Sequence, residues 1–181
     1  MAEPQQALRA VCYCHDCQAY ARLLGKPEQV LDRLGGTDIV ATQSKYVRFT
    51  SGSANLACMS LSPRGLLRWY ARCCNTPVAN TPRDWRLPYT GMVHTVLRQP
   101  DRLERSFPRV QMQVNTKSAR SKPPQEGQVS GLFGFAVLML KLVTARLLGH
   151  YTSTPFFDAQ GKPVASVTVP TREAVEAARR A

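Results

Sequence analysis

The chain lacks the features that would place it in a membrane or outside the cell. None of its uninterrupted apolar runs reaches about 18 residues, so we expect no membrane span. Its start, Met1 to Gln6, has no basic stretch leading into an apolar one, which is not typical of a secretion signal. Wholesale disorder is excluded because 44% of the 181 residues are hydrophobic. We therefore predict one cytoplasmic domain with an extension, whose cysteines remain thiols.

Acidic residues are scarce as well. Asp and Glu number 12 against 24 Lys and Arg, a formal net charge of +12. This positive charge is spread along the chain, with a mild concentration from Arg98 to Lys122 and no recognisable nucleic-acid-binding motif there. We expect weak attraction to polyanions at low salt and no specific nucleic-acid binding.

Short β-type runs separated by turns fill the first two-thirds of the chain. The turn Ser62-Pro63-Arg64-Gly65 predicts a hairpin, because proline favours the second position of a tight turn. One early helix is expected over 16–24, where apolar residues recur at helical spacing. The pattern predicts a mainly β (α+β) fold with an antiparallel sheet. The expected strands are 38–41, 46–50, 56–61, 66–71, 76–80 and 89–97.

The chain changes character after residue 115. A basic loop rich in Ser, Lys and Pro follows, so we predict a β domain over 1–115, a mobile loop over 116–130 and a C-terminal extension over 131–181. The apolar segment 131–149 is interrupted by Lys141 and Arg146. It predicts a helix that packs on the β core or on a second subunit, or lies at an interface, rather than a membrane span.

Three cysteines lie within six residues, in Cys12-Tyr13-Cys14-His15-Asp16-Cys17. On an extended backbone the first two point to the same face, and a C-x-x-C turn brings Cys17 back towards Cys14 at a helix start. Three thiolates on one turn suit a tetrahedral zinc ion. The fourth position would be left to water, a substrate sulfur or a remote cysteine. The alternatives are three buried small side chains or a redox pair.

Five further residues are candidates for roles around this cluster. Cys73 and Cys74 cannot both face inward on a regular strand, and one of them could be the fourth ligand. Alignment with the family named below favours Cys74. His15 is a candidate acid, or a residue that only faces solvent. Arg68 and Arg72, on one face of a regular strand, could hold an anionic substrate or cofactor, or be solvated.

Two motifs in this order resemble the glutathione-dependent formaldehyde-activating enzyme (GFA) family, whose domain is shared with centromere protein V. They are the C-x-C-x-x-C and the segment from Arg68 to Pro77, within a resemblance that covers about residues 10–95. The resemblance implies a zinc-pinned antiparallel β-tent in which Cys12, Cys14 and Cys17 hold a zinc ion with an open position for a glutathione thiol. The later part, 154–164, is similar to a bacterial branch of that family.

The chain departs from the family pattern at a second, structural zinc site. The eleven residues before Cys12 contain no cysteine, and Ala71 stands where the later motif has its first one. The chain therefore looks like an N-terminally shortened member without the first hairpin, or like a member whose start was placed downstream of the real one. We expect one zinc ion per chain.

Two functions follow from these expectations. The resemblance implies a carbon–sulfur lyase that acts on a glutathione-type thiol adduct of a small carbonyl. The alternative is a non-catalytic zinc-stabilised module that binds a partner, including a second copy, through the C-terminal helix. An exchangeable fourth zinc ligand would favour the enzyme, and four protein thiolates would favour the module.

Overall fold

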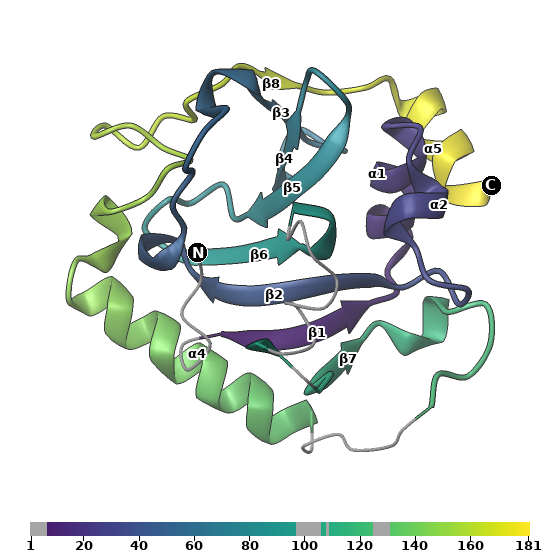
Figure 1. Cartoon of the computed structure of the whole chain (residues 1–181), viewed down its shortest axis with the longest axis horizontal. Coiled ribbons are helices and arrows are strands. Elements are labelled where there is room, and N and C mark those ends of the chain that lie inside the picture. The colour runs from purple at the N-terminus through teal and green to yellow at the C-terminus, as the bar shows by residue number, and fades with distance from the viewer. Residues whose placement is uncertain (1–6, 97–105, 108, 125–130) are drawn as a thin grey trace.

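A sheet of eight strands organises the chain (Figure 1), in the order β7-β1-β2-β6-β5-β4-β3-β8. The computed structural model describes residues 7–96, 106–107, 109–124 and 131–181. The strands are β1 (Leu8–Cys12), β2 (Thr37–Gln43), β3 (Leu56–Met59), β4 (Leu67–Ala71), β5 (Thr76–Thr81), β6 (Tyr89–Val93), β7 (Met112–Val114) and β8 (Val167–Thr168). The α-helices include α1 (His15–Leu23), α2 (Pro27–Val30), α4 (Gly131–Leu147) and α5 (Arg172–Arg180).

The predicted mainly β, α+β class is confirmed, but the sheet is not purely antiparallel and one predicted strand is wrong. Strands β1 to β6 pair antiparallel with their neighbours, including the predicted β3–β4 hairpin. Both outermost strands are parallel additions, β7 beside β1 and β8 beside β3. The predicted strand at 46–50 is wrong. Its apolar residues Val47 and Phe49 pack on the core from a loop, with the Phe49 ring 5.6 Å from that of Phe156.

The larger core lies on one face of the sheet. Trp69 is fully buried there, with its ring 5.2 Å from that of Phe156 in the C-terminal extension. The Trp69 indole N–H donates to the Thr81 hydroxyl at 2.9 Å, which satisfies the one polar atom of that side chain. The C-terminal extension is therefore part of the core.

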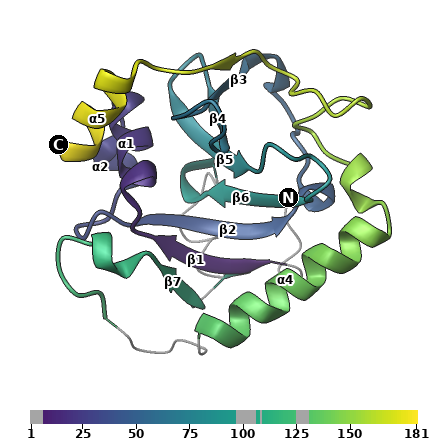
Figure 2. The same cartoon turned by 180° about the vertical axis from the view of Figure 1, so that it is seen from behind.

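Helices α1 and α5 cover the other face and lie side by side (Figures 1 and 2). Ala19 and Tyr20 of α1 pack with Val175 and Ala178 of α5. The Tyr20 hydroxyl donates to the main-chain oxygen of Trp69 at 2.8 Å, which fixes α1 against β4. This contact therefore positions the first turn of α1 relative to the sheet.

Helix α4 runs along the opposite side of the molecule (Figure 2). It buries Leu142 and Ala145, but Leu140 is 68% exposed, so only part of the apolar surface predicted to pack is covered. Among the described residues, no helix is both long and apolar enough to cross a membrane.

The segment after residue 115 makes specific contacts where it is described. A 3-10 turn spans Thr116–Ser118, and the Ser118 carbonyl accepts from the Gln18 side chain at 3.0 Å. The Arg120 N–H donates to the Leu34 carbonyl at 3.0 Å. Residues 125–130 of the loop predicted to be mobile lie outside the described residues, and the domain boundaries at 115 and 130 stay predictions.

Candidate metal centre

The three clustered cysteines meet where β1 ends and α1 begins. Cys12 is the last residue of β1, Cys14 caps the N-terminus of α1, and Cys17 lies in the first turn of that helix. Their sulfur atoms all lie within 4.8 Å of one another. Cys12 and Cys17 are buried, and Cys14 is partly exposed. The predicted convergence of these side chains is confirmed.

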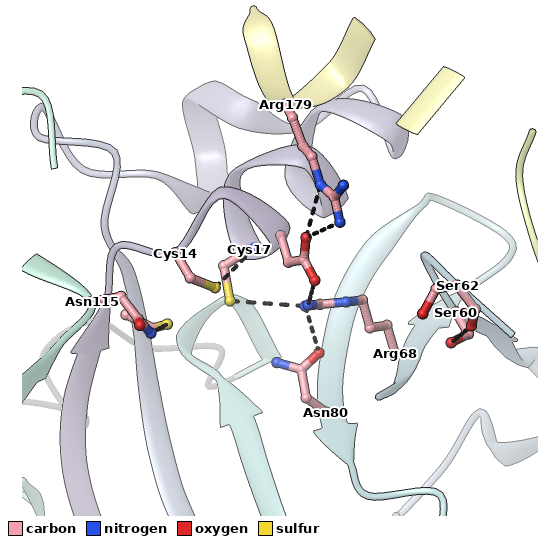
Figure 3. Close-up of polar contacts among 10 residues, drawn as sticks. Cys14, Cys17, Ser60, Ser62, Arg68, Asn80, Asn115 and Arg179 are labelled. Carbon is pink, nitrogen blue, oxygen red and sulfur yellow. Dashed lines mark hydrogen bonds and ion pairs between the residues drawn. The ribbon is translucent and has the colours of Figure 1, made fainter. Parts of the chain in front are cut away.

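The geometry of the helix start explains why the turn closes. Cys14 has an extended backbone, with φ −62° and ψ 147°, which is typical of an N-cap residue. Its Sγ accepts the Cys17 backbone N–H at 3.3 Å, and its carbonyl oxygen accepts the same N–H at 3.0 Å (Figure 3). The positive end of the helix dipole therefore faces the Cys14 sulfur and favours its thiolate form.

The donor set fits a soft metal ion. Sulfur atoms about 2.3 Å from a tetrahedral zinc ion lie roughly 3.8 Å apart, so a small contraction of the observed cluster would suffice. Among the described residues, this is the one group of three or more His, Cys, Asp or Glu side chains placed to hold a metal. The cluster can therefore hold a metal ion, with three sulfur ligands from the protein.

The three thiols do not share their protons equally. Hydrogen bonds from the Cys12 and Cys17 thiols lower the pKa of Cys14. The interactions with Cys14 and burial raise the pKa of Cys12, and the hydrogen bonds within the cluster and burial raise the pKa of Cys17. Without a metal, the cluster thus holds one thiolate, on Cys14, that accepts from two thiols.

This distribution predicts the proton count of zinc binding. At pH 7 Cys14 is already ionised and Cys12 and Cys17 are protonated, so binding should release about two protons and affinity should rise with pH. Calorimetric titration in two buffers of different ionisation enthalpy measures the number. Release of three protons would show that Cys14 is a thiol in the metal-free protein.

A buried arginine lies beside the thiols. Arg68 on β4 is 3% exposed, and its guanidinium donates to the Cys17 sulfur at 3.8 Å and to the Asn80 side-chain oxygen at 3.4 Å. Burial acts to lower the pKa of Arg68, but the interactions with Cys17, Cys14 and Asp16 raise it overall, so the group stays charged. Its polar contacts with other described residues, at 3.4 to 3.8 Å, are longer than an ordinary hydrogen bond.

An acidic bridge joins this arginine to the C-terminal helix (Figure 3). The Asp16 carboxylate lies 3.8 Å from Arg68 and accepts from Arg179 of α5 at 2.6 and 3.0 Å. Asp16 belongs to the first turn of α1, between the two cysteines of that turn. The end of α5 is thus linked through two ion pairs to the cysteine cluster.

Two further polar side chains approach the cluster from strands and loops. The Asn115 amide donates to the Cys12 sulfur at 3.6 Å. Tyr89 reaches back over Gly91 on β6, where a Cβ atom would lie 2.8 Å from the tyrosine oxygen. Gly91 pairs with Asn80, so Tyr89 shares a sheet face with the asparagine beside Arg68. Burial raises the pKa of Tyr89, with Cys17 and Cys12 adding to the effect, and keeps its phenol neutral.

The structure separates the other residues that the sequence singled out. His15 is exposed at the start of α1 and makes no hydrogen bond or ion pair to another described residue. Arg72 is exposed in the turn that follows β4 and donates to the Ala54 carbonyl, so it does not join Arg68 at the cluster.

Cys74 is exposed in the β4–β5 turn and does not join the cluster. Its sulfur lies 3.0 Å from the Thr76 hydroxyl and 3.7 Å from the Cys73 sulfur. Cys74 is not among the three residues grouped for a metal, so the structure does not place it as the fourth ligand.

Sequence reasoning missed the partners that lie far apart in the chain. Asn80, Tyr89, Asn115 and Arg179 reach the site only through strand pairing and helix packing. One usable signal was Gly91, because a glycine inside a strand often marks the close approach of another group.

Comparison with known proteins places the chain in one family. A family model described as "Family of unknown function (DUF6151)" matches residues 2–168. No curated protein and no solved structure matches the chain.

Proposed function

The chain belongs to DUF6151, a family of unknown function. We propose, on the cysteine cluster and on the sequence resemblance, that it is a zinc protein of the GFA type. Its proposed activity is that of a carbon–sulfur lyase, which acts on the adduct of a glutathione-type thiol with a small carbonyl. One observation carries the proposal: three cysteine sulfurs within 4.8 Å of one another beside a buried arginine. The resemblance of the two sequence motifs to the GFA family supplies the reaction class.

The number of protein ligands supports a catalytic zinc site rather than a purely structural one. Catalytic zinc sites take three protein ligands and leave the fourth position for water or substrate, whereas structural sites take four. The cluster offers three, and Cys14 is the partly exposed member through which a ligand could approach. A zinc ion held there would lower the pKa of a bound thiol and favour the thiolate.

The surrounding side chains suit the oxygen of a thiol adduct. When such an adduct splits, its carbon–sulfur bond breaks, the sulfur leaves as a thiolate, and the hydroxyl loses its proton as the carbonyl forms. The Arg68 guanidinium has N–H groups available for the oxygen on which negative charge develops, because its present contacts are long. The Tyr89 hydroxyl and the Asn80 amide on the same face can hold that oxygen in place.

The second candidate is a non-catalytic zinc module. It is favoured by the way the cluster ties β1 to α1, and α1 to α5 through Asp16 and Arg179. A metal at this junction would stabilise the fold even if no substrate bound. The two candidates differ in whether the fourth position exchanges.

Cobalt substitution separates the two candidates. In an open site, excess glutathione should change the visible spectrum of the cobalt protein, because a fourth sulfur replaces water in the ligand set. The spectrum should be unaffected by the methyl thioether of glutathione, which has no thiol. A spectrum unchanged by excess glutathione in the wild-type protein would favour the structural module.

A further inference from the structure

Helix α4 presents an apolar surface that nothing in this proposed chemistry uses. Leu140 is 68% exposed and Leu147 is 81% exposed, although leucine is among the residues most often buried. Leu142 and Ala145, by contrast, are buried on the sheet side. The exposed large apolar side chains from this helix and its end are Phe133, Val137, Met139, Leu140, Val143, Leu147 and Leu148.

Four of these side chains, Phe133, Val137, Leu140 and Leu147, form a stripe along the helix. Positions 133, 137, 140 and 147 recur at three- or four-residue intervals or their multiples, so they lie on one face of the helix. Leu142 and Ala145 lie on the opposite face, roughly half a turn away. A helix that is apolar all round is normally covered on every side. Here the rest of the chain covers one side and leaves the stripe at the surface.

The charge around the stripe is positive. Residues 127–157 contain no Asp or Glu, while Lys141 and Arg146 lie within the helix. The loop that meets the end of α4 adds Arg83 and Arg86, and its one acid, Asp84, accepts from Arg146 at 2.9 Å. With a net charge of +12, two copies of the chain would repel each other across this helix.

We propose that the α4 stripe docks on the surface of an anionic lipid membrane. Apolar side chains flanked by basic ones are the pattern of a helix that lies in the membrane interface, where charged heads reach anionic phosphates. The 17 residues of α4 extend roughly 25 Å, and its other face is held against the protein, so it lies on the bilayer rather than across it.

The position of α4 leaves the metal centre accessible. The helix lies on the opposite side of the molecule from α1 and α5, as Figures 1 and 2 both show. A protein docked through α4 would therefore keep the cysteine cluster away from the bilayer. The docking inference does not depend on the identity of the metal or on the lyase proposal.

Vesicle flotation with the full chain tests the docking. Wild-type protein should float with vesicles that contain about 30% phosphatidylglycerol and bind far less to neutral phosphatidylcholine, with binding reduced by salt. The double variant Leu140→Glu/Leu147→Glu should lose at least about tenfold in affinity. The matched control Val164→Glu/Val169→Glu changes two apolar residues that are also exposed, 52% and 47%, and should bind as wild type.

Fluorescence quenching gives a second test that does not depend on the folding of the glutamate variants. Tryptophan introduced by Leu147→Trp should be quenched by brominated lipid, whereas tryptophan introduced by Val169→Trp should not. Absence of wild-type flotation at low salt, or equal binding to neutral vesicles, would overturn the proposal. A lipid-free dimer that Leu140→Glu/Leu147→Glu converts to monomer, without vesicle binding by the wild type, would assign the stripe to a second copy instead.

Discussion

A Cys14→Ser variant is expected to lose its zinc. Structural zinc sites bind with a total free energy of about 10–16 kcal/mol, so losing one of three thiolates should cost about 4 kcal/mol, or roughly a thousandfold in affinity. Cys14 is the most effective single target, because it is the thiolate of the metal-free cluster and its sulfur also caps α1. Metal content of the purified protein should fall from about one zinc per chain to a small fraction of that.

The matched control is another cysteine that the structure leaves out of the cluster. Cys74 is exposed and its sulfur is hydrogen-bonded to the Thr76 hydroxyl, so Cys74→Ser should retain the wild-type zinc content. Loss of zinc in Cys74→Ser would restore this residue as the fourth ligand. Two zinc ions per wild-type chain would show that a second site exists.

Local spacing predicted the centre of this site and could not predict its surroundings. The C-x-C-x-x-C geometry needs only one strand end and one helical turn, so Cys12, Cys14 and Cys17 could be placed from sequence. The position of Arg68 depends on which strands pair. Asn80 is opposite Arg68 only because β4 and β5 pair in that register.

The strands of the sheet likewise fall into those that local sequence predicts and those that depend on distant pairing. Strands that alternate or follow a recognisable turn were predicted, including the β3–β4 hairpin. Strands β7 and β8 have three and two residues and form only by adding to an existing edge, so their own sequences contain little signal. Residues 46–50 show the converse error, because an apolar loop segment that packs on a core resembles a strand.

Arg68 is expected to be the most sensitive residue outside the three cysteines. In an Arg68→Met variant the negative charge of the cluster loses its buried counter-ion, and Asn80 loses a donor. Removing one partner of a buried ion pair typically costs about 3–5 kcal/mol, because the remaining charge stays buried and uncompensated. The free energy of unfolding should fall by an amount in that range, and zinc affinity should fall about 10- to 100-fold, as when a group that supports metal ligands is removed.

A second arginine of the same β4 region supplies the control for this variant. Arg72 is exposed and, within the part of the chain that the structure describes, its side chain donates to one main-chain oxygen, so Arg72→Met should change stability by no more than about 0.5 kcal/mol and leave zinc binding intact. Arg68→Lys keeps the charge without the planar fork and should recover part of the stability but little of the geometry. Urea unfolding of the zinc-loaded proteins and competition with a chromogenic chelator measure the two effects. Arg68 is buried and Arg72 is exposed. Equal losses of stability and zinc affinity in Arg68→Met and Arg72→Met would therefore mean that the buried contact with Cys17 does not stabilise the centre.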